Sequence, residues 1–377
     1  MHVSKRNKVV TTRLSVANHP DFDGHEEVLY CEDAASGLRA IVAIHDTSLG
    51  PALGGCRMQS YATLDDALAD VLRLSRGMSY KHALAGTNQG GGKAVIFGDP
   101  ISDKSFNRVY AFGEFVHELG GRYITAEDVG ISVDDIAIIR EATPYAAGLP
   151  IEMGGSGDPS PMTAYGVYCG ILAAIEFRNC DSSEGASPLK GCRVAVQGLG
   201  KVGRELCRLL SLSGAALIVS DLNAASVSRI SEIYDAESCD AGDIFDVNAD
   251  IFAPCALGAI LTSSTVNRLK VAIVAGSANN QLADPEIATL LKDRNILYAP
   301  DYVINAGGII NISNEIGGYD EAQAFNQTSR IHNRLTDIFK QAAANNANTA
   351  EVADRMARTR FGPSNDLHST STAVDLR

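Results

Sequence analysis

The sequence predicts an α/β protein of two domains, and three observations support this. Short apolar runs alternate with helical patterns along most of the chain. The chain has 377 residues, which exceeds a comfortable single core at roughly 150 residues per domain. A stretch rich in glycine, proline and serine, 148–161, favours neither helix nor strand. We place the domain boundary there, with residues 1–148 and about 349–377 in the first domain and residues 149–348 in the second.

Composition argues against several partners and kinds of chemistry. The formal net charge is −13, so a nucleic acid or an anionic membrane would be repelled at long range. The N-terminal residues contain no long apolar core before a cleavage site, and no run approaches about eighteen apolar residues, so we expect a cytoplasmic protein. The eight cysteines form no C-x-x-C pair, which indicates neither a metal site nor a disulfide framework.

The first domain is expected to begin with a hairpin. Residues 28–31 and 38–45 have the pattern of two strands joined by a turn at 35–37. The glycine and proline of 49–55 predict a loop at the end of the second strand. Such loops often line a site.

A helix is expected next. Thr63 and Asp66 resemble a capping box, and apolar residues follow at helical spacing. We expect this helix to end at Gly77 or shortly after and to hand the chain to 78–81, which ends in a lysine.

Gly90-Gly91-Gly92-Lys93 precedes the apolar run 94–97. A backbone without side chains lets a ligand approach closely, and the apolar run predicts a buried strand that fixes Lys93 at the floor of a cleft. Burial and a second cation disfavour the ammonium form, so either Lys81 or Lys93 could supply a neutral amine near pH 7. The alternative is that the glycines only turn the chain and leave Lys93 solvated.

The rest of the first domain continues the alternation. A helix is predicted over 105–119, stopped by two glycines, and a strand over 123–125 runs toward Asp128. Open α/β sheets place ligands at the carboxyl ends of their strands. Asp128 is therefore a candidate for the cleft of Lys93, and the alternative is a helix cap or a loop acid.

The second domain is expected to open with a helix from about Met162 to Arg178, with Thr163 in its first turn. A strand over 192–197 then leads into a glycine motif, which is followed by a helix over 202–213.

The glycine motif is Gly198-Leu199-Gly200-Lys201-Val202-Gly203, a G-x-G-x-x-G between strand and helix. Its glycines permit a tight turn, close backbone approach to a pyrophosphate, and close packing of helix on strand. The next strand ends at Asp221, where a carboxylate accepts hydrogen bonds from the adenine ribose. The pattern predicts a Rossmann-type, doubly wound domain that binds NAD rather than NADP, and the alternative is a glycine-rich turn without a ligand.

Three further strands, predicted over 250–253, 271–275 and 296–299, each end in a loop with possible ligand contacts. Asn279 and Asn280 lie in the second of these loops and offer both donors and acceptors.

The C-terminal part is expected to be helical. A helix follows the Asn305-Ala306-Gly307-Gly308 turn, a long helix spans about 320–344, and a final helix spans 350–360. The tail 362–377 is expected to be poorly ordered.

Together the motifs resemble the glutamate/leucine/phenylalanine/valine dehydrogenase family, and within it the leucine dehydrogenases most closely. The resemblance covers nearly the whole chain in the right order and rests on these segments: 49–55, 77–81, 90–93, 125–130, 158–161 and 276–280. Two positions depart from the family pattern, Ser79 in place of threonine and Gln89 in place of an apolar residue, and neither changes a charge that the chemistry needs.

The resemblance implies NAD-dependent oxidative deamination of an L-amino acid to a 2-oxo acid, ammonia and NADH, with reversal by reductive amination. Lys81 would pair with the substrate carboxylate, assisted by Asn280. Lys93 would act as general base on water, and Asp128 would relay protons. The implied cofactor contacts are Thr163, Gly198, Leu199, Gly200, Lys201, Val202, Gly203, Asp221, Leu222, Cys255, Ala256 and Asn279.

The resemblance also implies the side-chain pocket and the assembly. The pocket maps to Leu53, Gly54, Met78, Ala126, Ile309 and Ile312, none of which could receive a glutamate γ-carboxylate. The methyl group of Ala126 favours leucine, valine or isoleucine. The alternatives are an aromatic substrate, phenylalanine or tryptophan, and a nucleotide-binding protein without catalysis. A homo-oligomer is implied, with the C-terminal helix returning to the first domain.

Overall fold

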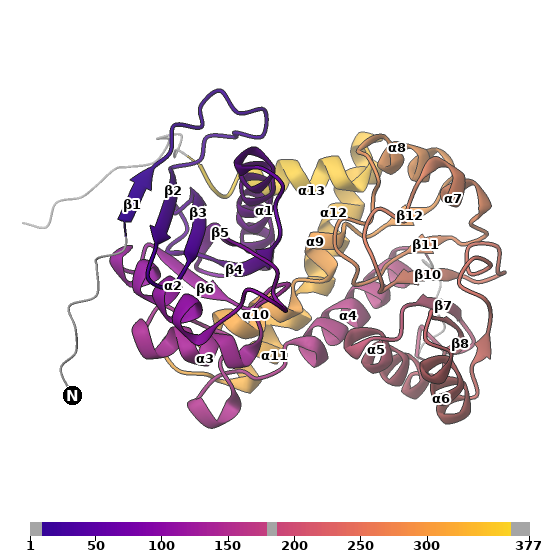
Figure 1. Ribbon diagram of the computed structural model, residues 1–377. Coiled ribbons are helices and arrows are strands. Elements are labelled where there is room, and N and C mark those ends of the chain that lie inside the picture. Colours follow the sequence, from indigo (N-terminus) through magenta and orange to yellow (C-terminus); the bar gives the residue numbers. More distant parts are fainter. Residues whose placement is uncertain (1–9, 179–186, 363–377) are drawn as a thin grey trace, which may run out of the picture.

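The computed structural model describes residues 10–178 and 187–362. Two six-stranded sheets lie side by side, with α4, α9, α10 and α12 between them (Figure 1). The two-domain α/β architecture is therefore confirmed. No helix in these two ranges is long and apolar enough to cross a membrane, and the predicted tail from 363 onward lies outside them.

The first sheet has the order β1-β2-β3-β5-β4-β6. Its strands are β1 (Val10–Arg13), β2 (Glu27–Asp33), β3 (Leu38–Asp46), β4 (Ala52–Gln59), β5 (Gly90–Phe97) and β6 (Tyr123–Ala126). The antiparallel hairpin of β2 and β3 confirms the predicted hairpin. β4 lies between β5 and β6 and is parallel to both.

Helices cover both faces of this sheet: α1 (Leu64–Ala85), α2 (Phe106–Glu118) and α3 (Val133–Ala142). Alternate residues of β3 separate the two cores, because Ile41 packs with α1 and Val42 packs with α2 and α3. The capping box of Thr63 and Asp66 is present at the start of α1.

The second sheet has the order β12-β11-β10-β7-β8-β9 and is parallel throughout. Its strands are β7 (Arg193–Gln197), β8 (Ala216–Ser220), β9 (Glu237–Ser238), β10 (Ile251–Pro254), β11 (Ile273–Val274) and β12 (Leu297–Tyr298). Strand order reverses beside β7, as in a doubly wound domain.

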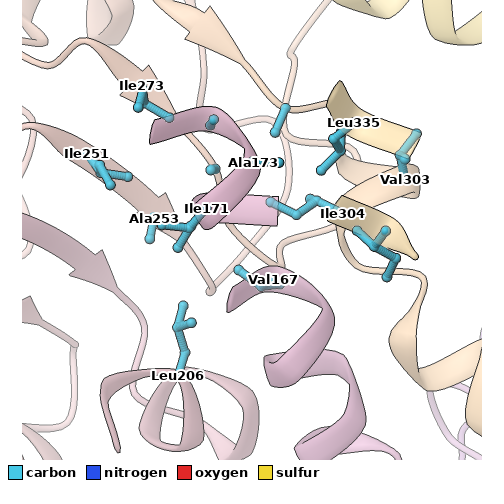
Figure 2. Close-up of a cluster of buried hydrophobic side chains, with 14 of the residues drawn as sticks. Val167, Ile171, Ala173, Leu206, Ile251, Ala253, Ile273, Val303, Ile304 and Leu335 are labelled. Atoms are coloured by element: carbon cyan, nitrogen blue, oxygen red, sulfur yellow. The ribbon is translucent and has the colours of Figure 1, made fainter. Parts of the chain in front are cut away.

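The helices of the second half are α4 (Ser160–Arg178), α5 (Lys201–Leu212), α6 (Ala224–Tyr234), α7 (Ser263–Arg268), α8 (Glu286–Asp293), α9 (Asp301–Ile304), α10 (Gly307–Ser313), α11 (Glu321–Ser329), α12 (Ile331–Asn345) and α13 (Thr349–Arg358). A short 3₁₀ helix, η1 (Ile151–Met153), lies in the linking segment. Figure 2 shows Val167 and Ile171 of α4 in the core of this domain, near Leu206 of α5 and Ile304 of α9.

The last described helix returns to the first domain, as predicted. α13 packs against α1, as Figure 1 shows. Arg358 bonds to Asp23 at 3.1 Å, and Arg360 donates to the carbonyl of Ala83 at 2.8 Å.

The predicted loop at 49–55 is partly strand, and the glycine run, for which a turn was the alternative, is strand as well. Residues 52–55 begin β4, and the glycine run 90–92 belongs to β5. A Cβ on Gly91 would lie 2.2 Å from the backbone nitrogen of Ser79, and one on Gly92 would lie 2.8 Å from the ring of Tyr123. These glycines therefore allow α1 and β6 to approach β5, and the alternative of a simple turn is wrong.

One predicted helix end is wrong, and one predicted long helix is two helices. α1 passes through Gly77 and ends at Gly86, which has a φ of +72°, because Tyr80 and Leu84 continue its buried face. The predicted helix 320–344 is divided at Arg330 into α11 and α12. Tertiary packing overrides the local signals in both places.

Candidate active site

Lys93 and Asp128 form the centre of the site. Lys93 lies on β5, Asp128 follows β6, and the Lys93 Nζ lies 2.6 Å from the Asp128 Oδ2. Only 7 % of Lys93 is exposed. Arg57 of β4 places its Nε 3.3 Å from the same carboxylate oxygen and its Nη1 3.1 Å from Asp70.

These charges determine the ionisation of Asp128. Burial favours the neutral acid, but the charges of Lys93 and Arg57 outweigh it and hold the pKa of Asp128 below its usual range. The site therefore contains a carboxylate that is ionised at neutral pH and shared by two cations.

Lys81 lies on the last turns of α1, half-buried beside this pair. Burial is the main cause that lowers the pKa of Lys81 to about 8, and Lys93 acts in the same direction. Asp301 and Asp128 oppose the shift. Lys81, Lys93 and Asp128 thus lie within electrostatic range of one another, and Lys81 has the lowered pKa that the sequence predicts for this pair of lysines.

A closed apolar cluster adjoins these charges. Its members are Leu53, Ile124, Ala126, Ala147 and Ile312, with Tyr145 and Ile309 packed against them. Leu53, Ala126, Ile309 and Ile312 are four of the predicted pocket residues. Gly54 and Met78 lie next to each other, since a Cβ on Gly54 would be 3.3 Å from the Met78 Cγ.

The G-x-G-x-x-G loop has the conformation that the sequence predicts. Gly198 has a φ of +95°, which an L side chain adopts only with strain. A Cβ on Gly203 would lie 1.9 Å from the carbonyl oxygen of Gly198, so the third glycine permits close packing of α5. A Cβ on Gly200 would meet no atom within 4 Å, so the second glycine faces open space.

Asp221 closes this loop at the end of β8. Its Oδ2 accepts a hydrogen bond from Leu199 N at 2.6 Å, and its Oδ1 accepts one from Asn223 N at 2.8 Å. Leu222 is 89 % exposed. An ionisable carboxylate and an accessible apolar side chain thus stand beside the glycine loop.

The other predicted cofactor residues border the loop in different ways. Cys255 donates its backbone N–H to Gln197 at 2.7 Å, and a Cβ on Gly198 would lie 2.7 Å from Ala256 N. The Lys201 ammonium is directed to Asp158, at 3.0 Å.

Thr163, on α4, donates its hydroxyl to the carbonyl of Pro159 at 3.0 Å. Asn279 and Asn280 are exposed. Asn279 accepts a hydrogen bond from Asn305 at 2.8 Å, and Asn280 has a φ of +50°.

Sequence reasoning missed Arg57 and Asn305 as parts of the site, and it placed Asp301 only in a loop with possible ligand contacts. The sequence could have indicated Arg57, because residues two apart on a strand lie on the same face, and Arg57 is two residues from Gly55. That signal was hidden by the prediction of a loop at 49–55.

No group of three or more potential metal ligands of the His, Cys, Asp and Glu types occurs within 10–178 and 187–362. The seven cysteines in these ranges are free thiols.

The two sheets and the site between them define a two-domain α/β oxidoreductase. Residues 25–145 match the dimerisation domain of the Glu/Leu/Phe/Val dehydrogenases, and residues 221–361 match the Glutamate/Leucine/Phenylalanine/Valine dehydrogenase domain. The chain belongs to this family and is an amino-acid dehydrogenase.

Individual relatives agree with this assignment. The chain is 50 % identical to leucine dehydrogenase of Geobacillus stearothermophilus, over 89 % of this chain and 90 % of the relative. It is 46 % identical to valine dehydrogenase of Streptomyces virginiae, over 91 % and 95 %. The crystal structure of L-tryptophan dehydrogenase from Nostoc punctiforme superposes with a TM-score of 0.79 at 43 % identity, over 89 % and 96 %.

Proposed function

We propose that the protein catalyses the NAD-dependent oxidative deamination of a branched-chain L-amino acid, such as leucine, valine or isoleucine, and the reverse reductive amination. The observation that carries the proposal is the Lys93–Asp128 pair beside a cluster whose described members are all uncharged. Such a cluster can receive an aliphatic side chain but leaves a second carboxylate without a partner. The leucine and valine dehydrogenase relatives support this choice.

An aromatic amino acid is the second candidate. The similarity to the tryptophan dehydrogenase from Nostoc punctiforme favours it. The methyl group of Ala126, which is buried beside Leu53 and Ile312, favours the branched-chain substrate. A difference of one methylene changes selectivity by only about 1–3 kcal/mol.

The second domain fits NAD. The space in front of Gly200 and the strained Gly198 form a backbone cradle for a pyrophosphate. Asp221 would accept hydrogen bonds from the ribose hydroxyl groups there and would repel a 2′-phosphate. The bound cofactor would supply the acceptor for the hydride of the substrate α-carbon. Thr163, Asn279, Cys255 and the 198–203 loop would hold it.

Three side chains of the first domain would perform the remaining steps. The Lys81 ammonium pairs with the substrate carboxylate, with help from Asn280, and thereby directs the apolar side chain toward Leu53 and Ala126. Lys93 would act as the general base on the water that attacks the imino carbon. The 2.6 Å contact lets that proton pass to Asp128, which delivers it to the departing nitrogen.

The segment between the domains is a candidate hinge. The carboxylate of Glu315 accepts backbone hydrogen bonds from Gly148 at 2.8 Å and from Ser156 at 2.7 Å. We place the domain division at 148/149, with about 349–377 on the first domain. Closure about this hinge would exclude water during hydride transfer.

We also propose that the protein is a homo-oligomer. The matched segment 25–145 is described as a dimerisation domain in the family. The net charge of −13 argues against nucleic-acid and membrane partners.

The test is the rate of NADH formation with leucine, valine, isoleucine, phenylalanine, tryptophan and glutamate, each with NAD and with NADP. We expect the highest kcat/KM with a branched-chain amino acid and NAD, and no turnover of glutamate. A higher kcat/KM with phenylalanine or tryptophan would select the aromatic candidate. Binding of NAD without turnover of any amino acid would overturn the catalytic proposal.

A further inference from the structure

Asp301, the first residue of α9, holds the loop that carries Asn280. Its Oδ2 accepts a hydrogen bond from Gln281 N at 2.9 Å, and its Oδ1 accepts one from Tyr302 N at 2.6 Å. Burial raises the pKa of Asp301, whereas these backbone N–H groups, Lys81 and the nearby N–H of Asn280 oppose the rise and favour the carboxylate. A single carboxylate therefore satisfies the backbone at the point where Asn280 has its positive φ.

The loop is also fixed from its inner side. The fully buried Gln281 amide donates to the carbonyls of Gly276 and Ala278, at 2.9 and 3.0 Å. Asn305, which directly follows α9, donates to the Ser277 carbonyl at 3.2 Å. With both sides anchored to α9, the direction of the Asn280 side chain depends on where α9 sits.

Asp301 also faces the first domain. α9 packs against α1, and Asp301 lines a cavity of about 210 Å³ together with Asn280 and with Gly77 and Tyr80 of α1. The other charged groups that line this cavity are Arg73, Arg76 and Asp354. Lys81 follows Tyr80 on this helix. Asp301 has the largest electrostatic effect on Lys81, ahead of Lys93 on β5 and of Asp128 after β6.

We propose that Asp301 is a positioning residue whose one carboxylate both places Asn280 and provides the counter-charge of Lys81 across the junction between the domains. The inference rests on the proposed role of Lys81 as the partner of the substrate carboxylate. Asp301 would thereby link Lys81 and Asn280, the two residues expected to hold the substrate carboxylate, although they belong to different domains.

The direction in which the Asp301 charge changes the pKa of Lys81 is defined. Burial and Lys93 disfavour the Lys81 ammonium, whereas Asp301 and Asp128 favour it, and together they place its pKa at about 8. A carboxylate ligand is held while Lys81 is charged, so its affinity is present below this pKa and lost above it. Removal of the Asp301 charge lowers the pKa of Lys81 and moves the loss of affinity to lower pH.

The experiment measures the Ki of 4-methylpentanoate, a competitive inhibitor with the leucine side chain and no amino group, from about pH 6 to about pH 10. In the wild-type enzyme we expect a constant Ki below about pH 8 and a rise of about ten-fold per pH unit above it. In Asp301→Asn we expect this break about one pH unit lower and a Ki about five-fold above wild type at pH 8, together with a lower kcat. Asp301→Glu keeps the charge and should restore the break but not kcat.

Asp354→Asn is the matched control, because Asp354 lines the same cavity and bonds the Tyr302 hydroxyl at 2.7 Å. It should keep the wild-type break. Asp301→Ser, which retains a hydrogen-bond acceptor, replaces Asp301→Asn if that variant does not fold.

A wild-type break in the Asp301 variant would overturn the inference, whatever its absolute Ki or Tm, because it would show a merely structural role. A wild-type protein that oxidises none of leucine, valine and isoleucine would instead contradict the proposed function. The same pH series would then use the amino acid that the panel identifies and the corresponding acid without its amino group.

Discussion

The two halves of the site are built by opposite means. The half in the first domain consists of buried and half-buried charged side chains, with Arg57 of β4, Lys93 of β5 and Asp128 after β6 brought together. The half in the second domain is mostly the backbone of one continuous loop, 198–203, with Asp221 at its side. Chemistry thus depends on contacts between distant parts of the chain, whereas dinucleotide binding depends on local conformation.

The two glycine runs show the same difference. In β5 the glycines make room for other parts of the protein, since a Cβ on Gly91 would meet Ser79 of α1. In the second domain Gly200 faces open space, and there a glycine makes room for a ligand. A glycine-rich sequence therefore has two meanings, which only the surroundings distinguish.

Removal of Lys93 should have the largest effect and would test whether the first half carries the chemistry. Lys93→Ala should lower kcat by about 10³-fold, since a positioned general base contributes typically 10²–10⁴-fold, while NAD binding measured by calorimetry stays unchanged. The control is Lys104→Ala, which breaks a similar buried pair with Asp135 at 2.7 Å in the same domain. Normal turnover by Lys93→Ala would show that this residue has no essential role.

Substitutions in the glycine loop of the second domain should separate effects on stability from effects on NAD binding. Gly203→Ala places a methyl group 1.9 Å from a backbone oxygen, so α5 must shift, at a cost of about 1–3 kcal/mol in the free energy of unfolding. Gly200→Ala adds its methyl group to open space on an extended backbone. It should keep the wild-type Tm and lose NAD affinity. Equal losses of Tm in the two variants would contradict the distinction between a packing glycine and a ligand-facing one.

The smallest effect is expected in the apolar cluster. Ala126→Gly removes a methyl group next to Leu53 and Ile312 and should raise the ratio of kcat/KM for phenylalanine over leucine by about ten-fold. Ala40→Gly, an equally small change in a different core of the same domain, should leave the ratio unaltered. An unchanged ratio in Ala126→Gly would mean that this cluster does not select the substrate.

Local signals in the sequence were sufficient for much of the fold. The hairpin of β2 and β3, the capped start of α1 and the β7–α5 glycine motif depend on short-range patterns, and all three are confirmed. Where α1 ends and what the glycines of β5 do depend on packing between α1 and β5, which no short window of sequence contains.

The same distinction applies to the site. The residues in recognisable motifs, such as Lys93 and Asp128, could be named from the sequence, and the structure brings them together. The sequence placed Asp301 in a loop with possible ligand contacts but could not assign its role, because that role arises from a backbone amide of the distant 276–281 loop and a lysine of another domain. An aspartate at the start of a helix is ordinarily interpreted as a helix cap.

The tight seating of α1 on β5 also limits how this protein can be redesigned. Because the strand that delivers Lys93 leaves no room for a methyl group at Gly91 or Gly92, directed evolution toward new substrates cannot recruit these positions. Useful diversity must come instead from the facing walls, Leu53, Ala126 and Ile312, so a small combinatorial library there would sample most of the attainable specificities.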